Sequence, residues 1–417
     1  MARAHILLCG VVLSAINAIA QPVPALQCTF NSAVTPTIRV EGLTESIGDV
    51  VVVCTGGTPT TPGGTVSRAD IRIFVNTNLT SRIVSPGFSE ALLMIDEPHS
   101  ASNPSVPFLP CGAATSGDDG TGVCPIIAGA TPNVTYNGTP GHPNVFQGQP
   151  DGVNAVVFKG VPIDPPAAQS TRVFRITNLR ANANQLGVSG TFIPSQVVAY
   201  ISPNPPNYLP LNNPQQTLAF ITNGLLSGGI TQSGSTYSVK LSEGFPGSWR
   251  ERNIQVHLSN TGLSSPFAAP SDSAQDVPGA NYFSESGFLV NGVAVAGTPP
   301  PGYGPLYGPL STPSPVFPST RGLSNAGTAA SGTRLLVRVT GVAPGVQITV
   351  PVQLQLKKVV SGVESVSGAA VLTSAALDGS GAFARIAGDA QGNAGLTVTG
   401  GAAVAVYEVL FSDPFNA

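Results

Sequence analysis

Glycine and proline recur along the whole chain and limit what it can fold into. The sequence has 48 glycines and 39 prolines among 417 residues, about a fifth of all positions. Both residues interrupt helices, because glycine loses much conformational freedom on folding and proline lacks a backbone donor. The glycines do not recur at every third position, as a collagen triple helix requires. The sequence therefore excludes a fold dominated by long helices and favours short elements joined by turns.

Apolar and polar residues alternate in many short segments, which is the period of a strand with one buried face. The clearest segment is residues 346–356, where Pro351 on the polar side indicates an edge strand or a bulge. Residues 335–339 alternate too, and the turn at residues 343–345 indicates a hairpin between the two segments. Similar segments are residues 50–53, 71–75, 172–177, 197–201 and 404–411. We predict an all-β protein of two or three antiparallel β-sandwich (Ig-like) modules with Pro/Gly-rich loops.

The first 20 residues have the pattern of a secretory signal peptide. Arg3 precedes an apolar run, and Ala18 and Ala20 place small residues before the predicted cleavage point at Gln21. The run is shorter than the roughly 20 apolar residues that cross a membrane, and no later stretch is long enough. We therefore expect a secreted protein with no membrane span in the mature chain, located outside the cell, on its surface or in a periplasm.

Composition also suggests domain boundaries. Prolines at 165 and 166 separate an N-terminal β domain, residues 21–165, from a middle β domain, residues 166–298. Residues 299–330 are a Pro/Gly-rich linker or long loop, because eight prolines fall between positions 299 and 318. Residues 331–417 form a C-terminal β region that either stands alone or packs with the middle domain.

Four cysteines remain once Cys9 is removed with the signal peptide. An even number in an exported chain indicates disulfides, whereas a metal site prefers close pairs such as C-x-x-C, which this chain lacks. Three pairings are open, and the nearest-neighbour pairing closes two modest loops. The four candidates all lie in the predicted N-terminal domain: Cys28, Cys54, Cys111 and Cys124.

Charge is scarce, and this excludes several classes of function. Charged residues make up 9% of the chain and the formal net charge is −3, against roughly a quarter charged in ordinary domains. A chain without a basic field is not expected to bind nucleic acid. The sequence also lacks the H-E-x-x-H, G-x-S-x-G, P-loop and dinucleotide-binding patterns. We therefore assign no catalytic residue and no cofactor.

Two groups of acidic residues are candidates for a functional site. Asp118 and Asp119 lie in a glycine-rich loop between two cysteines, where a calcium ion could take oxygen ligands. The alternative is a plain turn, which Asp and Gly favour for backbone reasons. Asp96 and Glu97 follow an apolar segment, and we expect them to face solvent at the end of a strand.

Aromatic residues offer three candidate ligand contacts. Trp249 is followed by Arg250 and Arg252 and could form a ligand surface with them, or it could fill the core beneath a short helical turn. Tyr303 and Tyr307 belong to a tandem Tyr-Gly-Pro-Leu repeat and are the other candidates.

Several phrases of the chain carry a resemblance to a known group. They are SEALLMIDEP (89–98), FRITNLRAN (174–182), SEGFP (242–246), GTRL (332–335) and VYEVL (406–410). Together they resemble a group of uncharacterised secreted proteins of soil bacteria of the acidobacterial kind. The resemblance implies an exported β-rich protein with cysteines near its N-terminus. It brings no activity, cofactor or catalytic residue.

Three functions remain open from the sequence. The first is a non-catalytic secreted or cell-surface structural or adhesion protein that binds copies of itself through strand edges, with residues 346–356 as the candidate edge. The second is a module that binds an extracellular polymer such as a polysaccharide, with Trp249 and the two tyrosines as contacts. The third is a secreted hydrolase whose carboxylates meet only in the folded protein.

Overall fold

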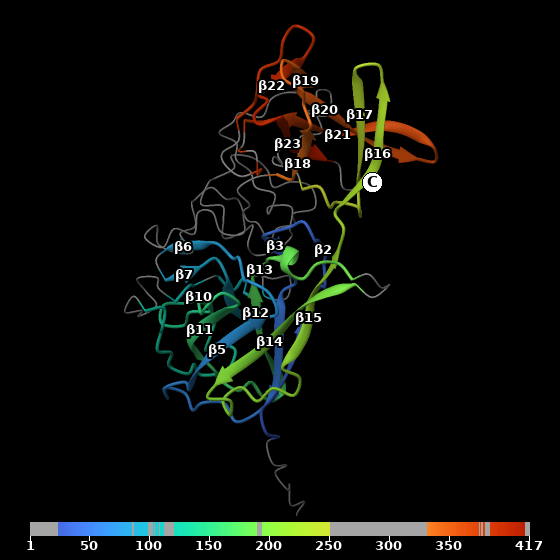
Figure 1. The fold of residues 1–417 in the computed structure, drawn as a ribbon. Coiled ribbons are helices and arrows are strands. Elements are labelled where there is room, and N and C mark those ends of the chain that lie inside the picture. Colours follow the sequence, from blue (N-terminus) through green and yellow to red (C-terminus); the bar gives the residue numbers. More distant parts are fainter. Residues whose placement is uncertain are drawn as a thin grey trace, which may run out of the picture.

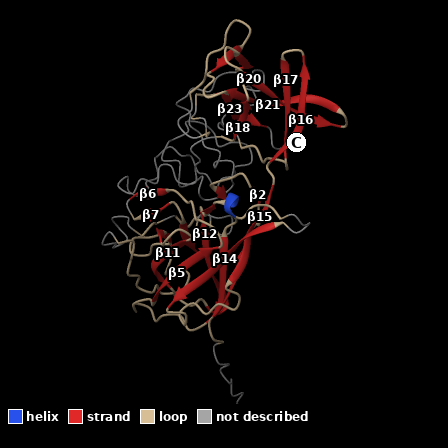
Figure 2. Ribbon diagram, viewed as in Figure 1, coloured by secondary structure: helices blue, strands red, loops and turns tan. Residues whose placement is uncertain are grey.

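The computed structural model describes residues 24–85, 87–98, 103, 105–107, 109–111, 121–189, 194–250, 332–374, 376, 378–379 and 384–412 (Figure 1). Strands make up almost all regular structure in these residues, beside one 3₁₀ turn, η1 (Ala183–Gln185) (Figure 2). The prediction of an all-β protein with several antiparallel sheets is confirmed. No helix among the described residues is long and apolar enough to cross a membrane.

Two larger sheets form what we call the N-terminal unit, residues 24–222. The first has five strands, in the order β1 (Gln27–Ser32), β4 (Val50–Gly56), β12 (Ala167–Thr177), β8 (Leu92–Ile95) and β9 (Val145–Gln147). The second has six, in the order β10 (Gln149–Pro150), β11 (Ala155–Pro162), β5 (Arg68–Val75), β14 (Ser195–Asn204), β15 (Gln215–Thr222) and β2 (Thr37–Arg39). Two short pairs complete the unit: β3 (Glu45–Ser46) with β13 (Arg180–Ala181), and β6 (Ile83–Ser85) with β7 (Phe88–Ser89).

The two sheets share one hydrophobic core. Buried and partly exposed positions alternate along β4 and β5, as expected for strands with one face against a core. Phe30 and Phe174 enter this core from the first sheet, and Ile73 and Ile201 enter it from the second. The predicted domain boundary near residue 165 falls between β11 and β12, although each of these strands pairs with strands from the first hundred residues.

The cysteines pair with their nearest neighbours in sequence. Cys28 and Cys54 lie directly opposite each other on β1 and β4 and form a disulfide. Cys111 and Cys124 form the second disulfide, and all four side chains are buried. This outcome fits the predicted disulfides and selects one of the three open pairings.

The second part of the molecule, which we call the C-terminal unit, contains residues 225–250 and 332–412. A hairpin of β16 (Leu225–Ser233) and β17 (Thr236–Glu243) precedes a four-stranded sheet. The sheet order is β18 (Arg334–Thr340), β23 (Ala402–Ser412), β21 (Val363–Leu372) and β20 (Gln353–Val360). A further pair joins β19 (Ile348–Pro351) to β22 (Asn393–Leu396).

One smaller core holds the C-terminal unit together. Trp249 is buried with Leu335, Leu372 and Tyr407, and Leu225 of the hairpin packs against them. Residues 225–250, which the sequence placed in the middle domain, therefore pack with the C-terminal region. The predicted linker, residues 299–330, lies outside the described residues.

The predicted strand over residues 346–356 is wrong as one element. The backbone N–H of Val352 donates to Gly392 O, 2.9 Å away, whereas its carbonyl accepts from the N–H of Leu372 at 2.8 Å. The chain therefore changes partners after Pro351 and forms β19 and β20 in different sheets.

The predicted hairpin between residues 335–339 and 346–356 is also wrong. β18 pairs with β23 instead, and its Arg334 lies opposite Glu408. The alternation of residues identified both strands, but it did not identify their partners.

Candidate functional site

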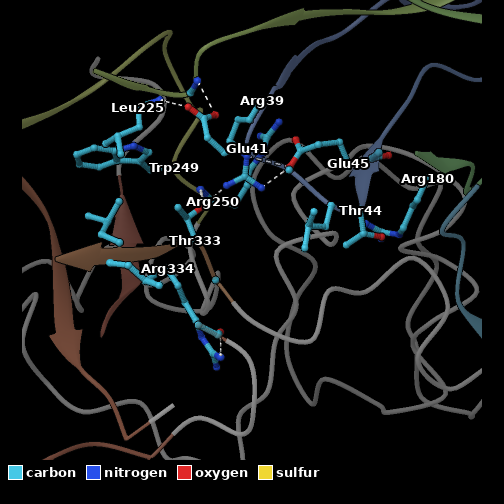
Figure 3. A pocket seen from close by; sticks show the side chains of 18 of the residues that line it. Arg39, Glu41, Thr44, Glu45, Arg180, Leu225, Trp249, Arg250, Thr333 and Arg334 are labelled. Carbon is cyan, nitrogen blue, oxygen red and sulfur yellow. Dashed lines mark hydrogen bonds and ion pairs between the residues drawn. The ribbon is translucent and has the colours of Figure 1, made fainter. Parts of the chain in front are cut away.

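A cleft of about 480 Å³ lies where the N-terminal and C-terminal units meet. On one side, the segment from β2 to β3 contributes Arg39, Glu41 and Glu45 (Figure 3). On the other, the end of the hairpin segment contributes Trp249, and the start of β18 contributes Arg334. We call this feature the interunit cleft. Its volume is in the range of small-molecule binding pockets.

Arg39 is held in place by contacts to both units. Its Nε donates to Glu45 Oε1 at 2.9 Å, and its Nη2 also contacts this oxygen. Its Nη1 donates to Thr333 Oγ1 of the C-terminal unit at 2.6 Å. Glu45 is almost fully buried, whereas the Arg39 side chain is about one-fifth exposed. The ion pair thus fixes a guanidinium that still reaches the cleft.

Glu41 and Thr333 make further contacts around the cleft. The two carboxylate oxygens of Glu41 accept hydrogen bonds from the backbone N–H groups of Gly224 and Leu225, at 2.9 and 3.2 Å. Thr333 Oγ1 accepts from the backbone N–H of Arg250 at 2.7 Å, and the N–H of Thr333 donates to Arg250 O at 2.7 Å. The rim of the cleft is therefore fixed by hydrogen bonds between distant segments.

Two more arginines in the cleft wall are paired with buried carboxylates. Arg334 Nε donates to Glu408 Oε2 at 2.9 Å, and Arg180 Nε donates to Glu90 Oε1 at 2.9 Å. Both glutamates are completely buried. Each guanidinium therefore has a compensating negative charge behind it, and the wall is polar without a strong excess of positive charge.

Trp249 is the predicted candidate that the fold brings to this cleft. Its side chain lines the cleft beside Leu225 but is only 8% exposed (Figure 3). The ring packs into the core of the C-terminal unit, and its Nε1 is buried without a hydrogen-bond partner among the described residues. Trp249 therefore contributes an apolar wall and offers no open ring face for stacking.

Glu243 supports Trp249 from the end of β17. Its Oε1 accepts a hydrogen bond from the backbone N–H of Trp249 at 2.8 Å. Burial raises the pKa of this carboxyl group, while the backbone N–H of Trp249 and the charge of Arg250 act in the opposite direction. The carboxyl group thus links the hairpin to the wall of the cleft.

The other predicted site residues are not brought to the cleft. Asp118, Asp119, Tyr303 and Tyr307 lie outside the described residues, so the calcium and tyrosine hypotheses stay predictions. Among the described residues, no group of three or more His, Cys, Asp or Glu side chains is arranged to hold a metal ion.

Asp96 and Glu97 correct another expectation, because neither simply faces solvent. Both have a positive φ, 59° and 47°, and each forms an ion pair with an arginine of β12. Asp96 pairs with the buried Arg172, whose guanidinium also lies 4.5 Å from the ring centre of Tyr136. Burial raises the pKa of Asp96 against the opposing effect of Arg172. These residues stabilise the interior of the N-terminal unit.

The sequence did not lead us to predict Arg39, Glu41 and Glu45 as site residues. In a chain with 9% charged residues, three charges within seven positions form a local cluster. That cluster was the available signal, since charged residues placed together in an apolar chain need partners when they are buried. Comparison with models of known protein families and with curated proteins gives no match.

Proposed function

We propose that this is a non-catalytic secreted or cell-surface structural or adhesion protein, built of β-sandwich modules of the Ig-like kind, that binds copies of itself through its C-terminal unit. The observation that carries the proposal is the exposure of apolar side chains on both faces of two hairpins in this unit. The two disulfides are compatible with an oxidising, extracellular location.

The β16–β17 hairpin exposes apolar side chains far from the core. Ile230 is 70% exposed and Tyr237 is 65% exposed. Ile230 lies opposite Val239, which is also exposed, and every residue from 236 to 240 is exposed. A two-stranded hairpin with both faces in water is marginally stable by itself. Contact with a second copy of the chain would bury these side chains.

The hairpin of β20 and β21 also exposes apolar side chains at its tip. Val360 and Val363 lie opposite each other and are 54% and 67% exposed, and Val359 and Val366 are exposed as well. Within the described residues, β20 pairs with β21 alone, so its outer edge has backbone groups available for another strand. Open edges of this kind form intermolecular sheets unless they are protected.

Electrostatic repulsion between copies would be weak. The whole chain has a net charge of −3, and Lys357 near the hairpin tip is paired with Glu364 at 3.0 Å. Two chains that approach through this tip would therefore meet its valines and one further charge, on Lys358 of β20. The low charge supports self-association in preference to a charged partner such as nucleic acid.

A matched pair of variants tests the proposal. We expect the chain from Gln21 onward to form oligomers or ordered assemblies in size-exclusion chromatography with light scattering and in negative-stain electron microscopy. Val360→Lys with Val363→Lys should shift it to monomers, because burial of two charges at the contact is unfavourable. Val153→Lys, at an exposed valine of the N-terminal unit, should assemble normally. A wild-type chain that stays monomeric at every concentration would disprove self-association.

A further inference from the structure

We propose that the interunit cleft binds a segment of an uncharged oligosaccharide. The proposal does not depend on self-association, because it concerns a different surface. It follows from three properties of the cleft: fixed donors beside fixed acceptors, an apolar wall, and arginines whose charge is already compensated.

The first property is a fixed donor beside a fixed acceptor. A guanidinium has five N–H donors, and Arg39 uses three of them on Glu45 and Thr333. A carboxylate accepts about four hydrogen bonds, and Glu41 accepts one at each oxygen from the backbone. Figure 3 shows both side chains on the same side of the cleft. Sugar hydroxyl groups donate and accept at once, so they match such a mixed surface.

The second property is the apolar wall on the other side. Trp249 and Leu225 line it, and Leu335 continues it beneath. Leu336 on β18 is 42% exposed and adds an apolar rim. The C–H face of a sugar ring is apolar and would pack against the accessible part of this wall, Leu225 and Leu336, while its hydroxyl groups face Arg39 and Glu41. The cleft therefore combines apolar side chains with placed polar groups, as small-ligand sites do.

The third property decides the charge of the ligand. Arg39, Arg180 and Arg334 each form an ion pair with a glutamate. Three of the cleft's arginines are therefore already neutralised. A carboxylate or phosphate ligand would have to compete with the glutamates that the fold holds in place beside them. A neutral sugar can bind the remaining N–H donors of Arg39 without displacing any of these glutamates. The compensated charges thus favour an uncharged oligosaccharide over an acidic one.

The chain's own fluorescence can report binding, because Trp249 is its only tryptophan. The chain from Gln21 onward is titrated with five neutral probes: cellohexaose, xylohexaose, maltohexaose, laminarihexaose and chitohexaose. Hexagalacturonate serves as the acidic probe, and isothermal titration calorimetry provides a second readout. We expect saturable binding of at least one neutral probe, and weaker binding of hexagalacturonate.

Two variants locate the binding site. Leu336→Glu, at an exposed position on the rim, should weaken binding roughly tenfold or more, and Glu41→Gln should weaken it by removing an acceptor. Val346→Glu is the matched control, since Val346 is 50% exposed and is not part of the cleft. Circular dichroism checks that each variant is folded. The proposal is overturned if no neutral probe binds in either measurement, if hexagalacturonate binds more tightly, or if Leu336→Glu and Val346→Glu bind equally well.

Discussion

The two units of this protein differ in where they bury and where they expose their apolar side chains. In the N-terminal unit, two sheets face each other and enclose large side chains such as Phe30 and Phe174. In the C-terminal unit, the four-stranded sheet has a smaller core, and its hairpins expose residues such as Ile230 and Val363. The N-terminal unit also exposes apolar residues such as Val153, but those of the C-terminal unit gather on two hairpins, where they are available for contact with a partner.

A buried ion pair of the N-terminal unit and an exposed one of the C-terminal unit give a second comparison, although the C-terminal unit also buries the pair of Arg334 and Glu408. The N-terminal unit buries the guanidinium of Arg172 and supports it with Asp96, two backbone carbonyls and the ring of Tyr136. At the tip of the β20–β21 hairpin, the pair of Lys357 and Glu364 is exposed. Buried pairs are costly to break, and exposed ones contribute little. Loss of a charge should therefore cost more stability at Arg172 than at the tip of the β20–β21 hairpin.

The largest effect is expected for Arg172→Ala. The change leaves Asp96 without its partner and opens a cavity beside Tyr136, so it should lower the free energy of unfolding of the N-terminal unit by about 3–5 kcal/mol. Hydrogen exchange of β4 and β12 in urea measures this unit, and Trp249 fluorescence measures the other. Arg72→Ala, at an arginine of β5 that is more than one-third exposed, as is its partner Asp151, is the control and should cost much less. An equal shift of both probes would show that the two units unfold together.

A smaller effect is expected for removal of one disulfide. Cys28 and Cys54 are 26 residues apart, and the chain-entropy model gives about 3.5 kcal/mol for a loop of this size. The double variant Cys28→Ala/Cys54→Ala should destabilise the sheet that contains β1 and β4 while the emission of Trp249 stays unchanged. Exchange rates in β1 and β4 measure the loss. If the Trp249 transition moves as well, the disulfide stabilises more than its own unit.

The sequence predicted strands well and their partners poorly. Alternation identified the segments that became β4, β5, β12, β14 and β23. It could not show that β18 pairs with β23, because their residues Arg334 and Glu408 are far apart along the chain. It also could not show that β12 enters a sheet between β4 and β8. Strand pairing depends on which surfaces are buried together, and a local pattern does not contain that information.

The candidate site was predictable only in part. Trp249 could be identified because it is the only tryptophan and is followed closely by two arginines. Its burial could not, since the ring fills a core that β18 and β23 complete. Arg39 and Thr333 are almost three hundred residues apart, and only the folded chain brings them into contact. A site formed by hydrogen bonds between distant loops has no spacing that a sequence pattern can detect.

The smallest effect is expected for Glu243→Gln, and it tests the C-terminal unit through pH. Burial raises the pKa of Glu243 above its unfolded value, so its contribution to stability is fully present at low pH and is lost as pH rises through the folded-state pKa. Glutamine keeps an oxygen that accepts from the N–H of Trp249 and does not titrate. The melting temperature of the variant relative to wild type should therefore be higher at pH 7 than at pH 4, as followed by Trp249 fluorescence.

Glu364→Gln, at an exposed glutamate on the neighbouring hairpin, is the control. A difference that is the same at both pH values, or larger at pH 4, would mean that the hydrogen bond from the backbone N–H of Trp249 and the charge of Arg250 outweigh burial at this carboxyl group.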